Sequence, residues 1–203
     1  MGLFILLAVL LVAAIIFFIA VAVFLSHISV SKFDFYCEKL VKRIAKKSNL
    51  LSLTNLNITN FDSNNIRINH VIFGKKYIYL ISDFKLNGFV HGDVNDKSWI
   101  YYNRKEKKHK YIVNLNELAD ENINEMSSLL GLNSDPFASI CLISNNCDFR
   151  IKNQNLKTNH MVHYLSLGRK IRKLEKSKID SLDEKQIYEE YKTIEEASKQ
   201  SSL

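Results

Sequence analysis

The chain has 203 residues, and its 28 lysines and arginines against 21 aspartates and glutamates give a formal net charge of +7. Its three cysteines, Cys37, Cys141 and Cys147, are an odd number that cannot pair completely within the chain. This usage argues against a disulfide-stabilised secreted scaffold and is typical of a reducing compartment. The six glycines are scattered and form no phosphate-binding loop. The composition therefore leaves a basic domain of ordinary type.

An uninterrupted apolar segment extends from Leu3 to Leu25 and contains no charge, amide or proline. As a helix it would be about 34 Å long at roughly 1.5 Å per residue, against a hydrocarbon core of about 30 Å. We therefore predict a single transmembrane helix. A cleaved signal peptide is the alternative, because Ala20-Val21-Ala22 has the small residues of a cleavage site, although no basic residue precedes the segment.

Basic residues follow this segment closely and none precedes it. Positive residues stay on the cytoplasmic side of a membrane span. We therefore expect a single-pass protein of the cell membrane with its C-terminal domain in the cytoplasm and the lipid bilayer as one partner. The basic residues concerned are Lys32, Lys39, Lys42, Arg43, Lys46 and Lys47.

The remaining chain predicts a series of helices and strands in order. Apolar residues at helical spacing from Phe33 to Lys47 predict a helix. The β-rich runs Ile66 to Phe73 and Tyr77 to Phe84, joined by Gly74-Lys75-Lys76, predict an antiparallel hairpin. Further elements are expected as short strands at Phe89 to Val90 and Trp99 to Tyr102, a helix from Asn116, its N-cap, to Leu130 before Gly131, a strand at Ala138 to Ser144, and a long helix from His160 to Lys176.

These elements define three parts of the chain. Residues 1–31 are the predicted membrane anchor and juxtamembrane segment, and residues 32–176 form an α/β domain around a mixed sheet. Residues 177–203 form an acidic tail, whose apolar residues are spaced for a loosely docked helix.

The segment between Phe33 and Arg172 resembles the nuclease-related domain family known as NERD, a branch of the PD-(D/E)xK nuclease-like fold. The resemblance rests on four parts of the chain. They are Glu38 in a first helix, the strand Arg67-Ile68-Asn69-His70-Val71-Ile72-Phe73, the stretch from Ile78 to Asp93 with Gly88, Gly92 and the later Trp99, and the helix start Asn116 to Glu121. It implies a restriction-endonuclease-like domain with the element order αβββαβ.

The resemblance also implies where the chemistry would be. Such nucleases hold a divalent metal with an Asp on one strand and an Asp or Glu on the next, and use a nearby Lys. Here the family's Asp position is Asn69, and without a gap its acidic and lysine positions fall on Ser82 and Phe84. A shift of one residue, absorbed by a β-bulge, would instead offer Asp83 and Lys85. Glu38, Asn69, Asp83 and Lys85 are thus the candidate catalytic residues, with Asp83 and Asn69 as metal ligands.

Two clusters in the domain concentrate the positive charge. They predict contacts with nucleic-acid phosphates, or alternatively with anionic lipid headgroups. The candidate nucleic-acid-binding residues are Arg104, Lys105, Lys107 and Lys108 in the first cluster and Arg169, Lys170, Arg172 and Lys173 in the second. The sequence specifies no protein partner.

Two functions follow from these residues. The first is a catalytically degenerate nuclease-related domain that acts as a binding or scaffold module, with no cofactor. The second is an active nuclease that uses Asp83 and Lys85 with Mg²⁺ or Mn²⁺. The side of the sheet that carries Asp83 separates the two.

Overall fold

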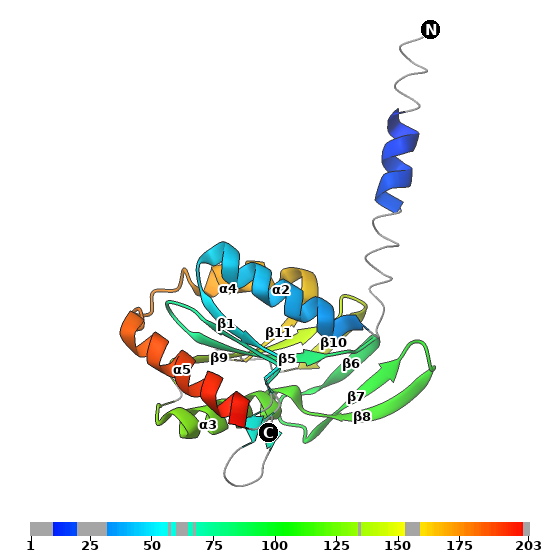
Figure 1. The fold of residues 1–203 in the computed structure, drawn as a ribbon. Coiled ribbons are helices and arrows are strands. Elements are labelled where there is room, and N and C mark those ends of the chain that lie inside the picture. The colour runs from blue at the N-terminus through cyan, green and yellow to red at the C-terminus, as the bar shows by residue number, and fades with distance from the viewer. Residues whose placement is uncertain are drawn as a thin grey trace. The chain divides into compact units, whose positions relative to one another are not determined.

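The computed structural model describes residues 10–19, 32–56, 58–59, 65–66, 68–133, 135–152 and 159–200. The chain divides into two compact units, Met1–Phe33 and Asp34–Leu203, and each is described by itself. The second unit is a mixed α/β domain with two main sheets (Figure 1).

The predicted transmembrane helix is wrong. In the described ranges, no helix is both long enough and apolar enough to cross a membrane. Within the apolar segment, the structure describes a helix over residues 10–19. Residues 3–9 and 20–25 of the predicted span lie outside the described residues. The assignment to the cell membrane, with the C-terminal domain in the cytoplasm, depended on that span and is overturned with it.

The five-stranded sheet has the order β1-β4-β5-β9-β11. Strands β1, β4 and β5 pair antiparallel, whereas β5–β9 and β9–β11 pair parallel. The hairpin of β4 and β5 confirms the prediction made from the runs around Gly74. The bounds are Leu51–Thr54 for β1, His70–Phe73 for β4, Ile78–Phe84 for β5, Phe137–Ile143 for β9 and Asn159–His163 for β11.

Helices cover both faces of this sheet. In Figure 1, α2 (Phe33–Ser48) and α4 (Leu167–Leu174) lie over one face, and α3 (Leu115–Leu130) and α5 (Glu184–Gln200) lie over the other. Ile123 and Met126 of α3 and Ile194 of α5 share one core cluster with Val71 and Leu80 of the sheet. Because successive strand residues point to opposite faces, the neighbours of these strand residues face α2 and α4 instead.

The second sheet has four strands in the order β10-β6-β7-β8. Strands β6, β7 and β8 pair antiparallel, and β10 pairs parallel with β6. Their bounds are Gly88–Asp93 for β6, Ser98–Asn103 for β7, Lys108–Val113 for β8 and Cys147–Lys152 for β10; β2 (Ile58–Thr59) and β3 (Asn65–Ile66) form a separate two-stranded ladder.

Several boundaries differ from the sequence prediction. The expected helix from His160 to Lys176 is wrong at its start, where strand β11 and a 3₁₀ turn, Tyr164–Ser166, precede α4. The N-cap of α3 is Asn114, whose side chain accepts from the backbone N–H of Asn116, the residue expected to be the cap. Gly131 ends α3 in the left-handed conformation, as predicted.

The C-terminal helix is docked more firmly than its composition suggests. Ile194 is fully buried, and the ring of Tyr191 packs edge-on against Phe73 with centroids 5.5 Å apart. A single apolar stripe on a charged helix is enough for this contact, because the opposite face of the helix stays in water.

Two glycines that carry the family resemblance have structural roles in the second sheet. A Cβ atom at Gly88, whose φ is +141°, would collide with the Tyr102 carbonyl oxygen of the neighbouring strand, and a Cβ at Gly92 would collide with the Trp99 ring. The Trp99 indole N–H donates to the Asp93 carbonyl oxygen at 2.8 Å. Close packing within the sheet therefore accounts for these residues without any role in chemistry.

We expect Gly88→Ala to lower the free energy of unfolding by at least about 2 kcal/mol, because both its backbone conformation and its clash must be relieved by backbone movement. Gly131→Ala is the matched control, since it also has a positive φ but no atom lies within 4 Å of its Cβ position. It should cost about 1 kcal/mol. Urea titration of both variants measures the difference, and equal losses would contradict the packing argument.

Candidate functional site

The candidate site lies where strands β4 and β5 separate. The last paired residues of the hairpin are His70 and Ile81. Beyond them, the Asn69 side-chain oxygen accepts the backbone N–H of Asp83 at 2.7 Å. The side chain of Asn69 therefore occupies the gap that opens between the two backbones and fixes the position of Asp83.

Ser82 and Asp83 point to opposite faces of the sheet. Ser82 is buried toward α3, where the Asn122 amide donates to its hydroxyl at 3.3 Å. Asp83 points toward α2 and approaches His70. The pairing of β5 with β9 is continuous from Ile78 to Phe84, so Asp83 reaches this face through ordinary strand alternation rather than through a bulge.

The carboxylate of Asp83 forms a buried pair with an imidazole. His70 Nε2 lies 2.9 Å from Asp83 Oδ2, and the two side chains are 1% and 2% exposed. Burial raises the pKa of the Asp83 carboxyl group above its ordinary value, while the hydrogen bond to His70 acts in the opposite direction. Burial, and then the Asp83 charge, raise the pKa of the neighbouring Cys37 thiol, which therefore stays protonated. His70 and Cys37 are site residues that the sequence reasoning did not select.

A cavity of about 700 Å³ opens beside this pair. Asn69, Asp83 and Lys85 all line it, so the structure brings together three of the four predicted catalytic residues. Glu38 is absent from its lining and bonds to Lys42 on the surface of α2, whereas Asp34, one turn earlier on the same helix, does line the cavity. The i, i+4 spacing of Asp34 and Glu38 was the signal that could have identified it.

The donor atoms at this site do not fit a divalent cation. The Asn69 oxygen is occupied by the Asp83 backbone N–H, and Asp83 Oδ2 is occupied by His70. Magnesium needs several accessible oxygen ligands in near-octahedral geometry. Within the part of the chain that the structure describes, no group of three or more His, Cys, Asp or Glu side chains could hold a metal ion.

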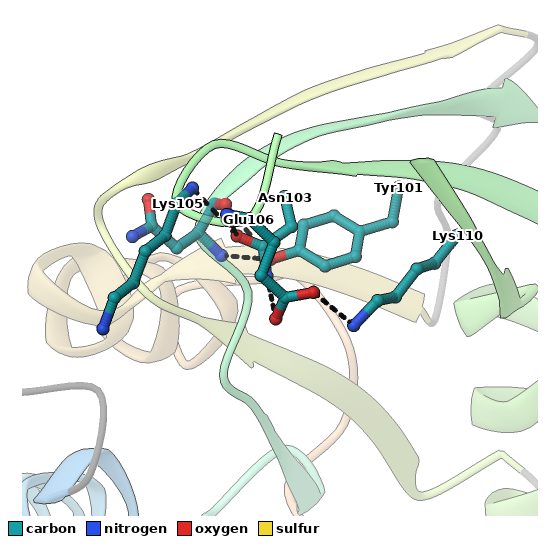
Figure 2. A network of polar contacts seen from close by, with 6 residues as sticks. Tyr101, Asn103, Lys105, Glu106 and Lys110 are labelled. Atoms are coloured by element: carbon teal, nitrogen blue, oxygen red, sulfur yellow. Dashed lines mark hydrogen bonds and ion pairs between the residues drawn. The ribbon is translucent and has the colours of Figure 1, made fainter. Parts of the chain in front are cut away.

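The first basic cluster forms the turn between β7 and β8 and continues into β8. Figure 2 shows how Asn103 shapes this turn: its side-chain oxygen accepts the backbone N–H groups of Lys105 and Glu106 at 2.9 and 3.1 Å. Glu106 also pairs with Lys110 at 2.7 Å. Residues 104–110 are all exposed, so the turn presents its remaining cations to solvent.

The second basic cluster lies on α4, beside α2. The Tyr164 hydroxyl before α4 donates to the Tyr36 carbonyl oxygen of α2 at 3.3 Å, and Figure 1 shows both helices over the same face of the sheet. Lys170 is half-buried, and burial lowers its pKa. The exposed cations of the two helices and of the turn directly after α4 are called here the basic helical face: Lys39, Lys42, Arg43, Lys46, Lys47, Arg169, Arg172, Lys173 and Lys176.

The basic helical face is only slightly neutralised. In the described residues, Lys42 with Glu38 is its one ion pair. Glu175, the acidic residue directly after α4, is instead turned toward the sheet, where it accepts from the Tyr79 hydroxyl at 2.6 Å. The positive potential of this face is therefore available to an external anion.

Comparisons of the chain with protein-family models, with curated proteins and with solved structures found no match.

We expect the His70–Asp83 pair to be strongly coupled. His70→Ala should lower the free energy of unfolding by about 3 kcal/mol, because it leaves a buried carboxyl group without its partner. Asp83→Ala should cost much less when His70→Ala is already present, giving a coupling of at least about 1 kcal/mol in a double-mutant cycle. The exposed pair Glu106–Lys110 is the control, and its cycle should give less than about 0.5 kcal/mol. Additive losses at positions 70 and 83 would contradict the pairing.

Proposed function

We propose that the Asp34–Leu203 unit is a nuclease-related module that binds nucleic acid without cleaving it. The expected αβββαβ order is wrong, because β2 and β3 come between β1 and β4, and β6, β7 and β8 come between β5 and α3. Support for the nuclease-related assignment comes instead from the five-stranded sheet, in which the β4–β5 hairpin brings Asn69 and Asp83 together.

The loss of cleavage rests on one observation, the burial of Asp83 against His70. A nuclease of this class needs an accessible carboxylate to hold the metal that activates water and neutralises the developing charge. In this chain the carboxylate is 2% exposed and bonded to an imidazole, and the amide oxygen of Asn69 carries no formal charge. We infer that Asn69, His70 and Asp83 stabilise the hairpin instead of holding a cation.

Binding of nucleic acid is supported by the basic helical face. Duplex DNA carries one phosphate charge per about 1.7 Å of its axis, so a rigid row of cations gains affinity by releasing condensed counterions. Helices α2 and α4 hold their exposed cations on a packed framework, because Cys37, Val41 and Ala45 of α2 and Leu167 and Ile171 of α4 are buried. Contacts of this kind recognise the backbone and give little sequence preference.

An active nuclease remains the second candidate, on a specific observation. Asp83 and Lys85 line the same cavity as Asn69 and Asp34, and Asp83 Oδ1 is buried without a hydrogen-bond partner among the described residues. Displacement of His70 would free one carboxylate for Mg²⁺ or Mn²⁺, with Lys85 beside it. Activity by this route requires the buried pair to open.

We expect no cleavage of duplex or single-stranded DNA or RNA by the purified protein with Mg²⁺ or Mn²⁺, because Asp83 is buried against His70 and Asp34 is then the one accessible carboxylate in the cavity lining. The assay compares the wild type with Lys85→Ala, an exposed position whose change leaves the core intact, and with Lys97→Ala as a matched exposed control. Cleavage that survives Lys97→Ala and disappears in Lys85→Ala would establish the second candidate.

Binding should depend on salt through the basic helical face. Each neutralised phosphate contributes roughly −0.9 to the log–log slope of affinity against salt on duplex DNA. The double variant Arg172→Gln/Lys173→Gln should therefore flatten the slope by up to about 2 while keeping helix propensity. Lys185→Gln/Lys199→Gln on α5 removes the same charge from the opposite face of the sheet and should leave the slope unchanged. Equal slopes for both double variants would remove the basic helical face from the proposal.

A further inference from the structure

The second sheet has one packed face and one exposed face. Val90, Trp99 and Tyr101 point inward and pack with Leu115 and Ala119 of α3. Their strand neighbours point outward, and the register places Phe89 opposite Tyr102, and Tyr102 opposite His109. Phe89 is 37% exposed, Tyr102 is half-buried and His109 is exposed.

These three outward residues form a continuous row of rings across β6, β7 and β8. The centroids of Phe89 and Tyr102 are 6.5 Å apart, and those of Tyr102 and His109 are 4.9 Å apart. The guanidinium of Arg104 lies over the Phe89 ring at 5.1 Å. We call Phe89, Tyr102, His109 and Arg104 the ring row.

A second line of outward residues continues the face toward the other end of the sheet. His91, Ile100 and Tyr111 are paired in register across the same three strands, and Tyr111 is 79% exposed. They line a cavity of about 980 Å³ that also includes Phe89 and Arg150. Aromatic side chains exposed on this scale on one sheet face mark an interaction surface rather than ordinary surface composition.

The charge around the ring row fits a polyanion. The turn that adjoins it carries Arg104, Lys105 and Lys107 against the single carboxylate of Glu106, whereas Lys108 and Lys110 pair in register with Asn103 and Tyr101 and lie on the other face of the sheet. Arg104 also lies 3.6 Å from Asp148, but these side chains are 54% and 61% exposed, so water weakens the attraction. Asp93 and Asp96 line the far end of the cavity, which places the positive potential at the ring row.

We propose that the ring row binds single-stranded nucleic acid by stacking unpaired bases on Phe89 and Tyr102, while the β7–β8 turn contacts the phosphates. The inference rests on the proposed function, because both take nucleic acid as the partner. It adds a separate binding surface and a preference for unpaired strands. Rings on a sheet face can stack only with bases that have left a duplex, whose own bases are stacked inside it. The Asn103 network that holds the turn in place prepares the cations for this contact.

The geometry also suits a sequence-tolerant contact. Neighbouring strands lie about 4.8 Å apart, so successive rings can take successive bases of an extended strand. Stacking needs only the flat face of a base, which all four bases possess. The guanidinium over Phe89 offers one further stacking surface and one charge at the same point.

The test is binding of the full chain to a fluorescent oligothymidylate of about 15 nucleotides, a length within the range that one such surface can cover, with a duplex of the same length as comparison. Phe89→Leu and Tyr102→Leu keep an apolar side chain and remove the ring. Each should weaken single-strand binding by about tenfold and leave duplex binding within about twofold. Tyr188→Leu on α5, a more exposed tyrosine at 53%, is the control and should change neither.

Arg104→Gln, at an exposed position, is the third variant, and urea titration shows whether each protein is folded. It should weaken single-strand binding by about threefold or more without unfolding the sheet. Single-strand binding that is unaffected by all three variants but lost in Arg172→Gln/Lys173→Gln would overturn the ring row and leave the proposed function standing. Loss of single-strand binding in the three variants, with duplex binding still dependent on the basic helical face, would support both. Absence of binding to either probe at low salt would overturn both.

Discussion

Burial of Asp83 against His70 is the constraint on which the arrangement of the domain depends. Removing a carboxylate from water costs several kcal/mol unless a partner and hydrogen bonds compensate. Here the imidazole supplies the partner, and Asn69 holds the backbone beside it at 2.7 Å. These contacts lock the register of β4 on β5, and that register determines which residues face α2 and which face α3. The same carboxylate group cannot bind a metal ion with the oxygen that pairs with His70. In this structure that oxygen of Asp83 pairs with His70.

Asp83 also shows how much of the candidate site could be predicted from the sequence. The pattern of alternating residues predicted the hairpin, and the structure confirms it from His70 to Ile81. The same pattern left open whether Ser82 or Asp83 lies at the candidate site, because this depends on which helix covers which face of the sheet. His70 could have indicated Asp83. It directly follows Asn69, so its side chain points to the face opposite that of Asn69 and meets Asp83 diagonally across the hairpin. Contacts between a strand and a distant helix, such as Cys37 with Asp83, leave no periodicity in the sequence.

Other differences have equally local causes. Strand β11 was predicted as helix because, over a short stretch, His160, Val162 and the following apolar residues fit the helical and the strand period equally well. In the structure this segment pairs parallel with β9 and is therefore a strand. The transmembrane helix was predicted from the length and apolar composition of the N-terminal segment, but no helix in the described residues is long and apolar enough to cross a membrane. The glycines and Trp99 that suggested a nuclease-related domain are required by close packing in the second sheet. They therefore report on fold and carry no information about catalysis.

The two candidate binding surfaces differ in the physics that each can use. The basic helical face is charged and exposes the ring of Phe35, so it gains affinity mainly through phosphate charge, which salt screens. The ring row presents aromatic rings on one face of the second sheet and gains affinity through stacking, which salt affects much less. A partner that presents both phosphates and unpaired bases would engage both kinds of surface. Neither surface includes Asp83 or His70, so nucleic-acid binding does not require the buried pair to open.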